Sequence, residues 1–206
     1  MLLNPYYFIL IFMYTIVGLG NPGKEYEMTR HNTGRIMLDY FAKSNDFSDW
    51  NENKKYKSLI SEGKIDKENV ILLKPETFMN KSGLSVKDLI NKDNAENLIV
   101  IYDDLDLGLG DFKISFNRGT GGHNGLESIV KTIKTKEFAR IRIGICPTTP
   151  TGKLKKPKGE EKVLNLIMKD FKKPELDVLK KISKKINIAL EMIVKEGRDK
   201  AMNEFN

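Results

Sequence analysis

The chain has 206 residues, with a hydrophobic share of 40% and a charged share of 31%, and this balance favours one globular domain over a disordered chain. Its formal net charge of +7 favours a polyanionic partner. A lone cysteine, Cys146, excludes an intrachain disulfide and fits a reducing cytoplasm, and two histidines do not supply the usual ligand cluster of structural zinc.

The chain opens on twelve apolar residues, MLLNPYYFILIF. No positively charged segment precedes this run and no small-residue cleavage site follows it, so it lacks the features of a signal peptide. Pro5 interrupts the run and charges begin by Lys24, which leaves it short of the roughly 20 residues of a spanning helix. We expect an apolar extension over 1–12, with Met13 as an alternative start, and a single domain over 13–206. A weak membrane tether is the alternative for the extension.

Strands and helices alternate along the rest of the chain. Apolar or alternating patterns predict strands over 13–19, 69–75, 97–104, 111–116 and 139–145. Apolar residues at helical spacing predict helices over 33–43, 81–92, 126–135 and 174–196. A glycine-rich turn is expected over 118–125 and a polar loop with three prolines over 147–162. The order predicts an α/β fold, a single domain with a mixed central β-sheet flanked by helices.

The stretch GLGNPG over 18–23 matches the glycine fingerprint of dinucleotide-binding proteins letter for letter. That fingerprint requires a helix that opens at the glycines and an acidic residue at the end of a second strand about 20 residues later. Here Gly23 is followed by KEYEMTRHN, which lacks an apolar helical face, and the helical pattern begins only near Thr33. The sequence therefore disfavours a nucleotide-cofactor enzyme.

The polar clusters point to other chemistry. The two histidines, His31 and His123, each precede an asparagine in glycine-rich surroundings, and Asp103, Asp104 and Asp106 follow a buried strand. Histidine accepts a proton near neutrality when a carboxylate fixes its tautomer. A His–Asp pair that activates water, with asparagine amides polarising a carbonyl, would hydrolyse an ester or a similar acyl bond.

Covalent and metal-assisted mechanisms have less support. There is no G-x-S-x-G elbow, and Cys146 has no flanking motif. The DDLD carboxylates could bind a divalent metal, but clustered partner ligands are missing from the sequence around them.

Five segments in this order resemble the bacterial-type peptidyl-tRNA hydrolase family: VGLGNPGKEYEMTRHNTG, LLKPETFMNKSG, VIYDDLDLGLG, GTGGHNGLESI and FARIRIGI. The resemblance covers residues 13–145 well and the C-terminal helices more loosely. It implies a catalytic domain that cleaves the ester between a peptide and the 3′-terminal ribose of tRNA, which recycles tRNA from prematurely released peptidyl-tRNA. The extension and the lysine-rich loop at 151–158 depart from the family's pattern.

The resemblance also implies roles for individual residues. His31 resembles the general base that activates water, Asp103 the carboxylate that orients it, and Asn21 the residue that checks that the α-amino group is acylated. Four residues match positions that hold the 3′-terminal nucleotide and the peptide main chain: Tyr26, Phe78, Asn80 and Asn124. Lys113, Arg118 and Arg142 are candidate phosphate contacts, and Arg140 with Arg142 gives one strand a basic face.

The leading hypothesis is thus a hydrolase of peptidyl-tRNA that needs no metal and no cofactor. It implies a cytoplasmic monomer without an obligate protein partner. The alternative is a noncatalytic RNA-binding relative of the same fold. The joint presence of Asn21, His31 and Asp103 argues against that alternative, because a protein that only binds RNA has no need of a water-activating pair.

Overall fold

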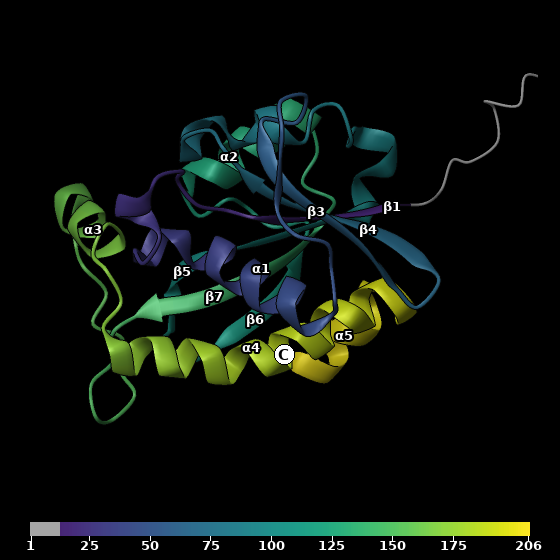
Figure 1. Ribbon diagram of the computed structural model, residues 1–206. Helices are drawn as coiled ribbons and strands as arrows, with labels where there is room; N and C mark the ends of the chain where they lie inside the picture. The colour runs from purple at the N-terminus through teal and green to yellow at the C-terminus, as the bar shows by residue number, and fades with distance from the viewer. Residues whose placement is uncertain (1–12) are drawn as a thin grey trace, which may run out of the picture.

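A mixed seven-stranded sheet runs through the protein, in the order β2-β3-β4-β1-β5-β7-β6 (Figure 1). The computed structural model describes residues 13–206, so the expected extension over 1–12 lies outside the described residues and stays a prediction. The strands are Met13–Gly18 (β1), Asn51–Asn53 (β2), Ser58–Ile65 (β3), Glu68–Pro75 (β4), Leu98–Gly108 (β5), Phe112–Phe116 (β6) and Ala139–Cys146 (β7). The central strands β4, β1, β5 and β7 are parallel, and antiparallel strands flank them on both sides.

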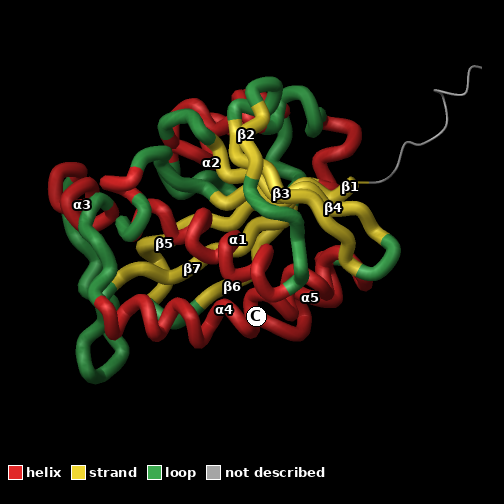
Figure 2. Tube along the Cα trace, viewed as in Figure 1, coloured by secondary structure: helices red, strands yellow, loops and turns green. Residues whose placement is uncertain are grey.

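Helices cover both faces of this sheet (Figure 2). The α-helices are Thr33–Ser44 (α1), Asn124–Ile133 (α2), Glu160–Ile167 (α3), Lys173–Glu196 (α4) and Arg198–Phe205 (α5). Helices α1, α4 and α5 pack on one core cluster, and α2 packs with the 3-10 segment Met79–Ser85 (η4) on the other. Among the described helices, none is long and apolar enough to cross a membrane.

The close approach of α1 to the sheet depends on Gly34. A Cβ atom at Gly34 would lie 2.3 Å from the carbonyl oxygen of Ile101 and 2.5 Å from the backbone nitrogen of Leu19. Only glycine fits there without moving backbone. The residues before α1 are therefore held against the carboxyl ends of β1 and β5, where open α/β sheets place their sites.

The chain leaves β1 through GLGNPG without starting a helix. Two short 3-10 segments, Lys24–Tyr26 (η2) and Arg30–Asn32 (η3), come first, and α1 begins at Thr33. Gly23 adopts a φ of 112°, which side chains rarely tolerate. Because the glycines do not open a helix, they do not form the phosphate-binding turn of a dinucleotide fold.

The predicted α/β architecture is confirmed, and so are its five strands and three of its four helices. The helix expected over 81–92 is wrong, since η4 and turns occupy this segment. Gly83 packs so closely on α2 that a Cβ atom would lie 2.4 Å from the carbonyl oxygen of Ser128, and the hydroxyl of Ser82 donates to the carbonyl of Met79. Serine and glycine favour such local bonding over a regular helix.

Four elements were not predicted: β2, β3, α3 and α5. Helix α3 falls at the end of the segment expected to be a loop over 147–162, and it has no buried residue. Earlier in the chain, one more 3-10 segment, Lys92–Asn97 (η5), precedes β5.

Candidate active site

His31 and Asp103 meet at the carboxyl end of the parallel strands. Asp103 lies in β5, and His31 lies in η3, which the tight packing of α1 places beside that strand. The Nδ1 atom of His31 lies 3.0 Å from Oδ1 and 3.1 Å from Oδ2 of Asp103. Both side chains are buried. The fold thus brings together the pair expected from the sequence, although the two residues are 72 positions apart in the chain.

The electrostatics of the pair follow from its burial. Burial opposes the charged imidazolium of His31, but the charge of Asp103 and its hydrogen bond outweigh this effect and raise the pKa of His31 above its ordinary value. Burial likewise opposes the ionised carboxylate, but the electrostatic attraction of His31 and His123 and their hydrogen bonds hold the pKa of Asp103 well below its usual range. Asp103 is therefore a fixed anion at neutral pH.

His123 is a third member of this cluster, and the sequence reasoning did not name it as a site residue. Its Nε2 atom lies 3.1 Å from Oδ1 of Asp103, and its ring centroid lies 5.0 Å from that of His31. At the other side of the ring, Nδ1 accepts from the backbone N–H groups of Gly125 at 3.2 Å and Leu126 at 3.4 Å. His123 is the N-cap residue of α2. The one sequence signal for it was the second His–Asn pair.

These contacts fix the tautomers of both histidines. A backbone N–H can only donate, so Nδ1 of His123 carries a lone pair and the ring proton lies on Nε2, which donates to Asp103. Asp103, being ionised, can only accept, so Nδ1 of His31 also carries a proton. The lone pair of His31 is then on Nε2, which is free to accept a proton from another molecule.

The same three residues form the candidate metal cluster among the described residues. Their ligand atoms all lie within 4.8 Å of one another, close enough for a small cation. A metal on Nε2 of His123 would leave the ring proton on Nδ1, where it would face the N–H groups of Gly125 and Leu126. The donor set therefore fits a hydrogen-bonded triad better than a metal site. Asp104 and Asp106 are instead paired with Arg142 and Lys156.

Asn21 is bonded to Asn32, the residue that follows His31. Its backbone N–H donates to Oδ1 of Asn32 at 2.8 Å, and its carbonyl accepts from Nδ2 of Asn32 at 2.9 Å. The side-chain Oδ1 of Asn21 accepts from the backbone N–H of Met79 at 2.8 Å. With its oxygen used in this way, Asn21 offers its Nδ2 group as a donor. The fold thus fixes the orientation of this amide, with its oxygen bonded to Met79 and its nitrogen left as a donor.

A cavity of about 820 Å³ opens over the triad. His31, Asp103 and His123 line it, together with three residues predicted to contact the substrate, Arg118, Asn124 and Arg142. Asn21, Tyr26, Phe78 and Asn80 are not among its lining residues. Phe78 is 59% exposed, so its side chain is not part of the core.

Two arginines of β7 have different environments. Arg142 is partly exposed, lines the cavity and donates to Asp104 at 2.7 Å. Arg140 is fully buried, and its guanidinium donates to the carbonyl of Gly119 at 2.8 Å and lies 4.6 Å from the ring of Phe138. The expected basic face is therefore wrong for Arg140, which anchors the glycine-rich loop instead of meeting phosphates. The exposure of each arginine therefore depends on the groups packed around it and not on the alternation of residues along the strand.

Arg30 anchors the segment TRHN (29–32) to the residues at the start of α4. Its guanidinium is buried and donates to Glu175 at 2.5 Å and to the backbone carbonyls of Asp170 at 2.7 Å and Lys169 at 3.1 Å. It also lies 4.9 Å from the ring of Phe171. The start of α4 and the segment that carries His31 thus form one unit.

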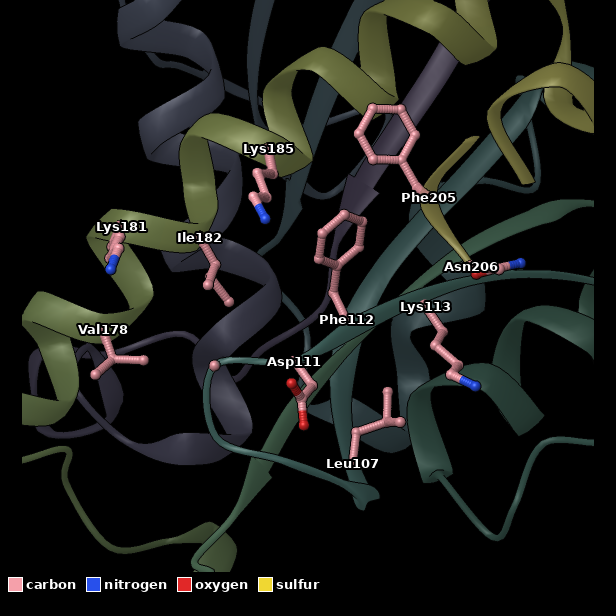
Figure 3. Close-up of a pocket in the computed structure, with 11 residues that line it drawn as sticks. Leu107, Asp111, Phe112, Lys113, Val178, Lys181, Ile182, Lys185, Phe205 and Asn206 are labelled. Atoms are coloured by element: carbon pink, nitrogen blue, oxygen red, sulfur yellow. The ribbon is translucent and has the colours of Figure 1, made fainter. Parts of the chain in front are cut away.

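A second cavity of about 580 Å³ lies between β6, α4 and the end of α5 (Figure 3). Phe112, Ile182 and Phe205 form an apolar part of its wall, and its lysines include Lys113 and Lys181. No member of the triad lines it. Lys113, a candidate phosphate contact, therefore faces this cavity and not the one over the triad.

Comparison with known proteins agrees with this geometry. The profile of the family described as peptidyl-tRNA hydrolase matches residues 15–206. A peptidyl-tRNA hydrolase of Thermoanaerobacter sp. (strain X514) is 41% identical and covers 94% of this chain and 100% of its own length, and one of Finegoldia magna is 43% identical and covers 94% and 97%. The crystal structure of peptidyl-tRNA hydrolase from Acinetobacter baumannii superposes with a TM-score of 0.81, at 30% identity and 96% coverage of both chains. The chain belongs to the peptidyl-tRNA hydrolase family.

Proposed function

We propose that this enzyme hydrolyses the ester between the peptide and the 3′-terminal ribose of peptidyl-tRNA, releasing free tRNA and peptide. The observation that carries the proposal is the His31–Asp103 pair, buried but open to a cavity of about 820 Å³. The family to which the chain belongs supports the substrate, since its relatives are peptidyl-tRNA hydrolases.

His31 is the general base of the proposed reaction. Its Nε2 atom takes a proton from a water molecule as that water attacks the acyl carbon of the ester. Asp103 stays ionised and stabilises the imidazolium that forms, as the carboxylate of a hydrolytic triad does. The tetrahedral intermediate then expels the ribose oxygen, which receives the same proton from His31.

Asn21 provides a means of sparing ordinary aminoacyl-tRNA. Its Nδ2 group can donate to the carbonyl that acylates the α-amino nitrogen of a peptidyl substrate, because its Oδ1 is occupied by Met79. A free α-amino group is a cation with donors only and offers no acceptor at that place. The fixed orientation of Asn21 supports discrimination by this single hydrogen bond.

Other predicted residues fit the two ends of the substrate. Asn124 and Asn80, both exposed, carry amides that can donate to and accept from a peptide main chain of any sequence. Tyr26 and Phe78 offer rings for stacking on the terminal base. Arg142 and the exposed Arg118 on the cavity's rim supply positive charge for the phosphates.

The proposed setting is the cytoplasm, where the enzyme would return tRNA from prematurely released peptidyl-tRNA to translation. We propose that it acts as a monomer, without a protein partner, a membrane or a cofactor. The single cysteine fits a reducing compartment.

One experiment tests the proposal. Wild-type protein and His31→Ala are incubated with aminoacyl-tRNA whose amino group is acetylated or free, and deacylation and tRNA binding are both measured. We expect turnover of the acetylated form only, and its loss in His31→Ala with tRNA binding retained. Tight binding of tRNA without turnover by the wild-type protein would instead favour a noncatalytic RNA-binding relative of the same fold.

A further inference from the structure

His123 connects Asp103 to the first turn of α2. Its Nε2–H donates to Oδ1 of Asp103, and its Nδ1 accepts from the N–H groups of Gly125 and Leu126. Both nitrogens of the ring thus form hydrogen bonds. The two roles are coupled, because a neutral ring carries its proton on one nitrogen and its lone pair on the other. The side chain is only 8% exposed.

The ring of His123 is also confined by its neighbours. It packs against His31 and, edge-on, against Tyr102, whose ring centroid lies 5.0 Å away. The N-terminus of a helix carries a partial positive charge, which opposes a second proton on the nearby Nδ1 atom. The contacts of the ring therefore select a single tautomer of His123, with the proton on Nε2 and the lone pair on Nδ1.

The bond from His123 constrains the carboxylate that His31 depends on. Oδ1 of Asp103 accepts from His31 at 3.0 Å and from His123 at 3.1 Å, while Oδ2 lies 3.1 Å from His31. With a single donor, the carboxylate could rotate about its last torsion, which is broad for aspartate. The second donor on Oδ1 restricts this rotation.

We propose that His123 is a positioning residue that holds the Asp103 carboxylate in the orientation that directs His31, and that it ties this carboxylate to the start of α2, which carries Asn124. The inference rests on the proposed function for its kinetic consequence. Its structural part, the control of Asp103 by a tautomer that α2 fixes, does not depend on the substrate. Substrate contacts at Asn124 and the water-activating pair would then share one rigid support.

The two bonds of His123 can be separated by two substitutions. In His123→Asn, the shorter side chain keeps an oxygen near Nδ1, which is a preferred cap, but loses the donor to Asp103. In His123→Gln, the terminal amide nitrogen takes the place of Nε2 and can donate to Asp103, but the cap is lost. Ser128→Ala is the control within α2, since it removes only the acceptor for the backbone N–H of Gly83.

We expect kcat of His123→Asn to fall roughly tenfold to a hundredfold, the size of effect that a small misplacement of a catalytic group produces, with little change in KM or in melting temperature. In His123→Gln, kcat should recover by about tenfold relative to His123→Asn, while the melting temperature falls by about 2–4 °C because the cap is lost. Ser128→Ala should lower the melting temperature without changing the pH profile.

A second readout needs no substrate. The chain has two histidines, so in His123→Asn the imidazole NMR signal of His31 stands alone and can be titrated directly. Asp103 loses the hydrogen bond that shares its charge, so the pKa of His31 should rise above that of the wild-type protein, and the acid limb of kcat/KM should move with it. In His123→Gln the pKa should return toward the wild-type value.

Specific outcomes would overturn the inference. Wild-type kcat and an unmoved His31 titration in His123→Asn would show that Asp103 needs no second donor. A kcat for His123→Gln as low as that of His123→Asn, or an equal shift of the acid limb in Ser128→Ala, would assign the effect to α2 as a whole. Absence of turnover by the wild-type enzyme would count against the proposed function alone, because the NMR titration would still decide the role of His123.

Discussion

Asp103→Asn is the sharpest perturbation of the proposed mechanism. The substitution keeps the shape of the side chain but removes a buried charge 3.0 Å from Nδ1 of His31. At an effective dielectric constant of about 20, a unit charge at this distance contributes roughly 5 kcal/mol to the stability of the imidazolium, as an upper bound. The new amide can keep its oxygen in the place of Oδ1, to which both histidines donate, but its NH₂ group then takes the place of Oδ2, 3.1 Å from Nδ1 of His31. The tautomer that leaves Nε2 basic is therefore no longer enforced.

We expect kcat of Asp103→Asn to fall by about 10²–10⁴, the usual contribution of a positioned general base, while tRNA binding is retained. Asp103 raises the pKa of His31 in the wild-type enzyme, so activity is lost as pH falls through a value above that of an ordinary histidine. Without the carboxylate charge, only burial remains, and the pKa of His31 should fall. The residual activity of the variant should therefore persist to lower pH than wild-type activity.

The assay is a pH profile of kcat/KM on N-acetylated aminoacyl-tRNA, with NMR titration of His31 beside it. Circular dichroism melts would establish that Asp103→Asn is folded at each pH. An acid limb that stays in place or moves to higher pH would refute the electrostatic reasoning. Full activity at neutral pH would remove Asp103 from the mechanism altogether.

Three further substitutions test other parts of the site. Phe78→Ala should raise KM by roughly 5- to 150-fold, the equivalent of a base stack of about 1–3 kcal/mol, without lowering the melting temperature; Ile188→Ala, also exposed and outside the cavity, is the control, and equal KM values would contradict stacking. Arg142→Ala should reduce the salt dependence of tRNA binding, measured as the slope of log K against log salt, by about 1. Lys181→Ala should leave that slope unchanged, and a matching change in both variants would argue against a specific contact. Arg30→Ala should lower the free energy of unfolding in urea by about 2–4 kcal/mol, because it removes a buried guanidinium with its partly buried ion pair to Glu175 and its bonds to two backbone carbonyls. A loss below about 1 kcal/mol would show that the anchor is dispensable.

The sequence predicted the parts of the fold whose side chains follow a clear period. The apolar runs of β1, β4 and β5 are buried in the middle of the sheet, and their register brings Asp103 to the carboxyl edge. Strand β3 was missed because its residues, SLISEGKI, alternate imperfectly and pair at the side of the sheet where polar residues are tolerated. The segment 81–92 was misassigned because the close contact of Gly83 with α2 is set by tertiary packing.

In the candidate site, too, the sequence predicted the features that depend on local segments and missed those that depend on tertiary packing. His31, Asp103 and Asn21 could be proposed because each lies in a segment with several recognisable neighbours. The role of His123 could not, because it depends on two elements far apart in the chain, β5 and α2, that meet only in the folded protein. Arg140 was misplaced for a related reason, since β6 on one side and the glycine-rich loop above it enclose a residue that alternation alone would leave at the surface.

The triad illustrates how a buried cluster can be both stable and basic. Asp103 has two donors, so its desolvation is offset by hydrogen bonds as well as by charge. One donor, His123, uses the lone pair of its Nδ1 atom to accept from the N–H groups of Gly125 and Leu126. The other donor, His31, uses Nδ1 for Asp103 and keeps its imidazole lone pair on Nε2, where it can accept a proton. The proposed choice of His31 as the general base therefore rests on the backbone N–H groups of Gly125 and Leu126 as much as on the carboxylate.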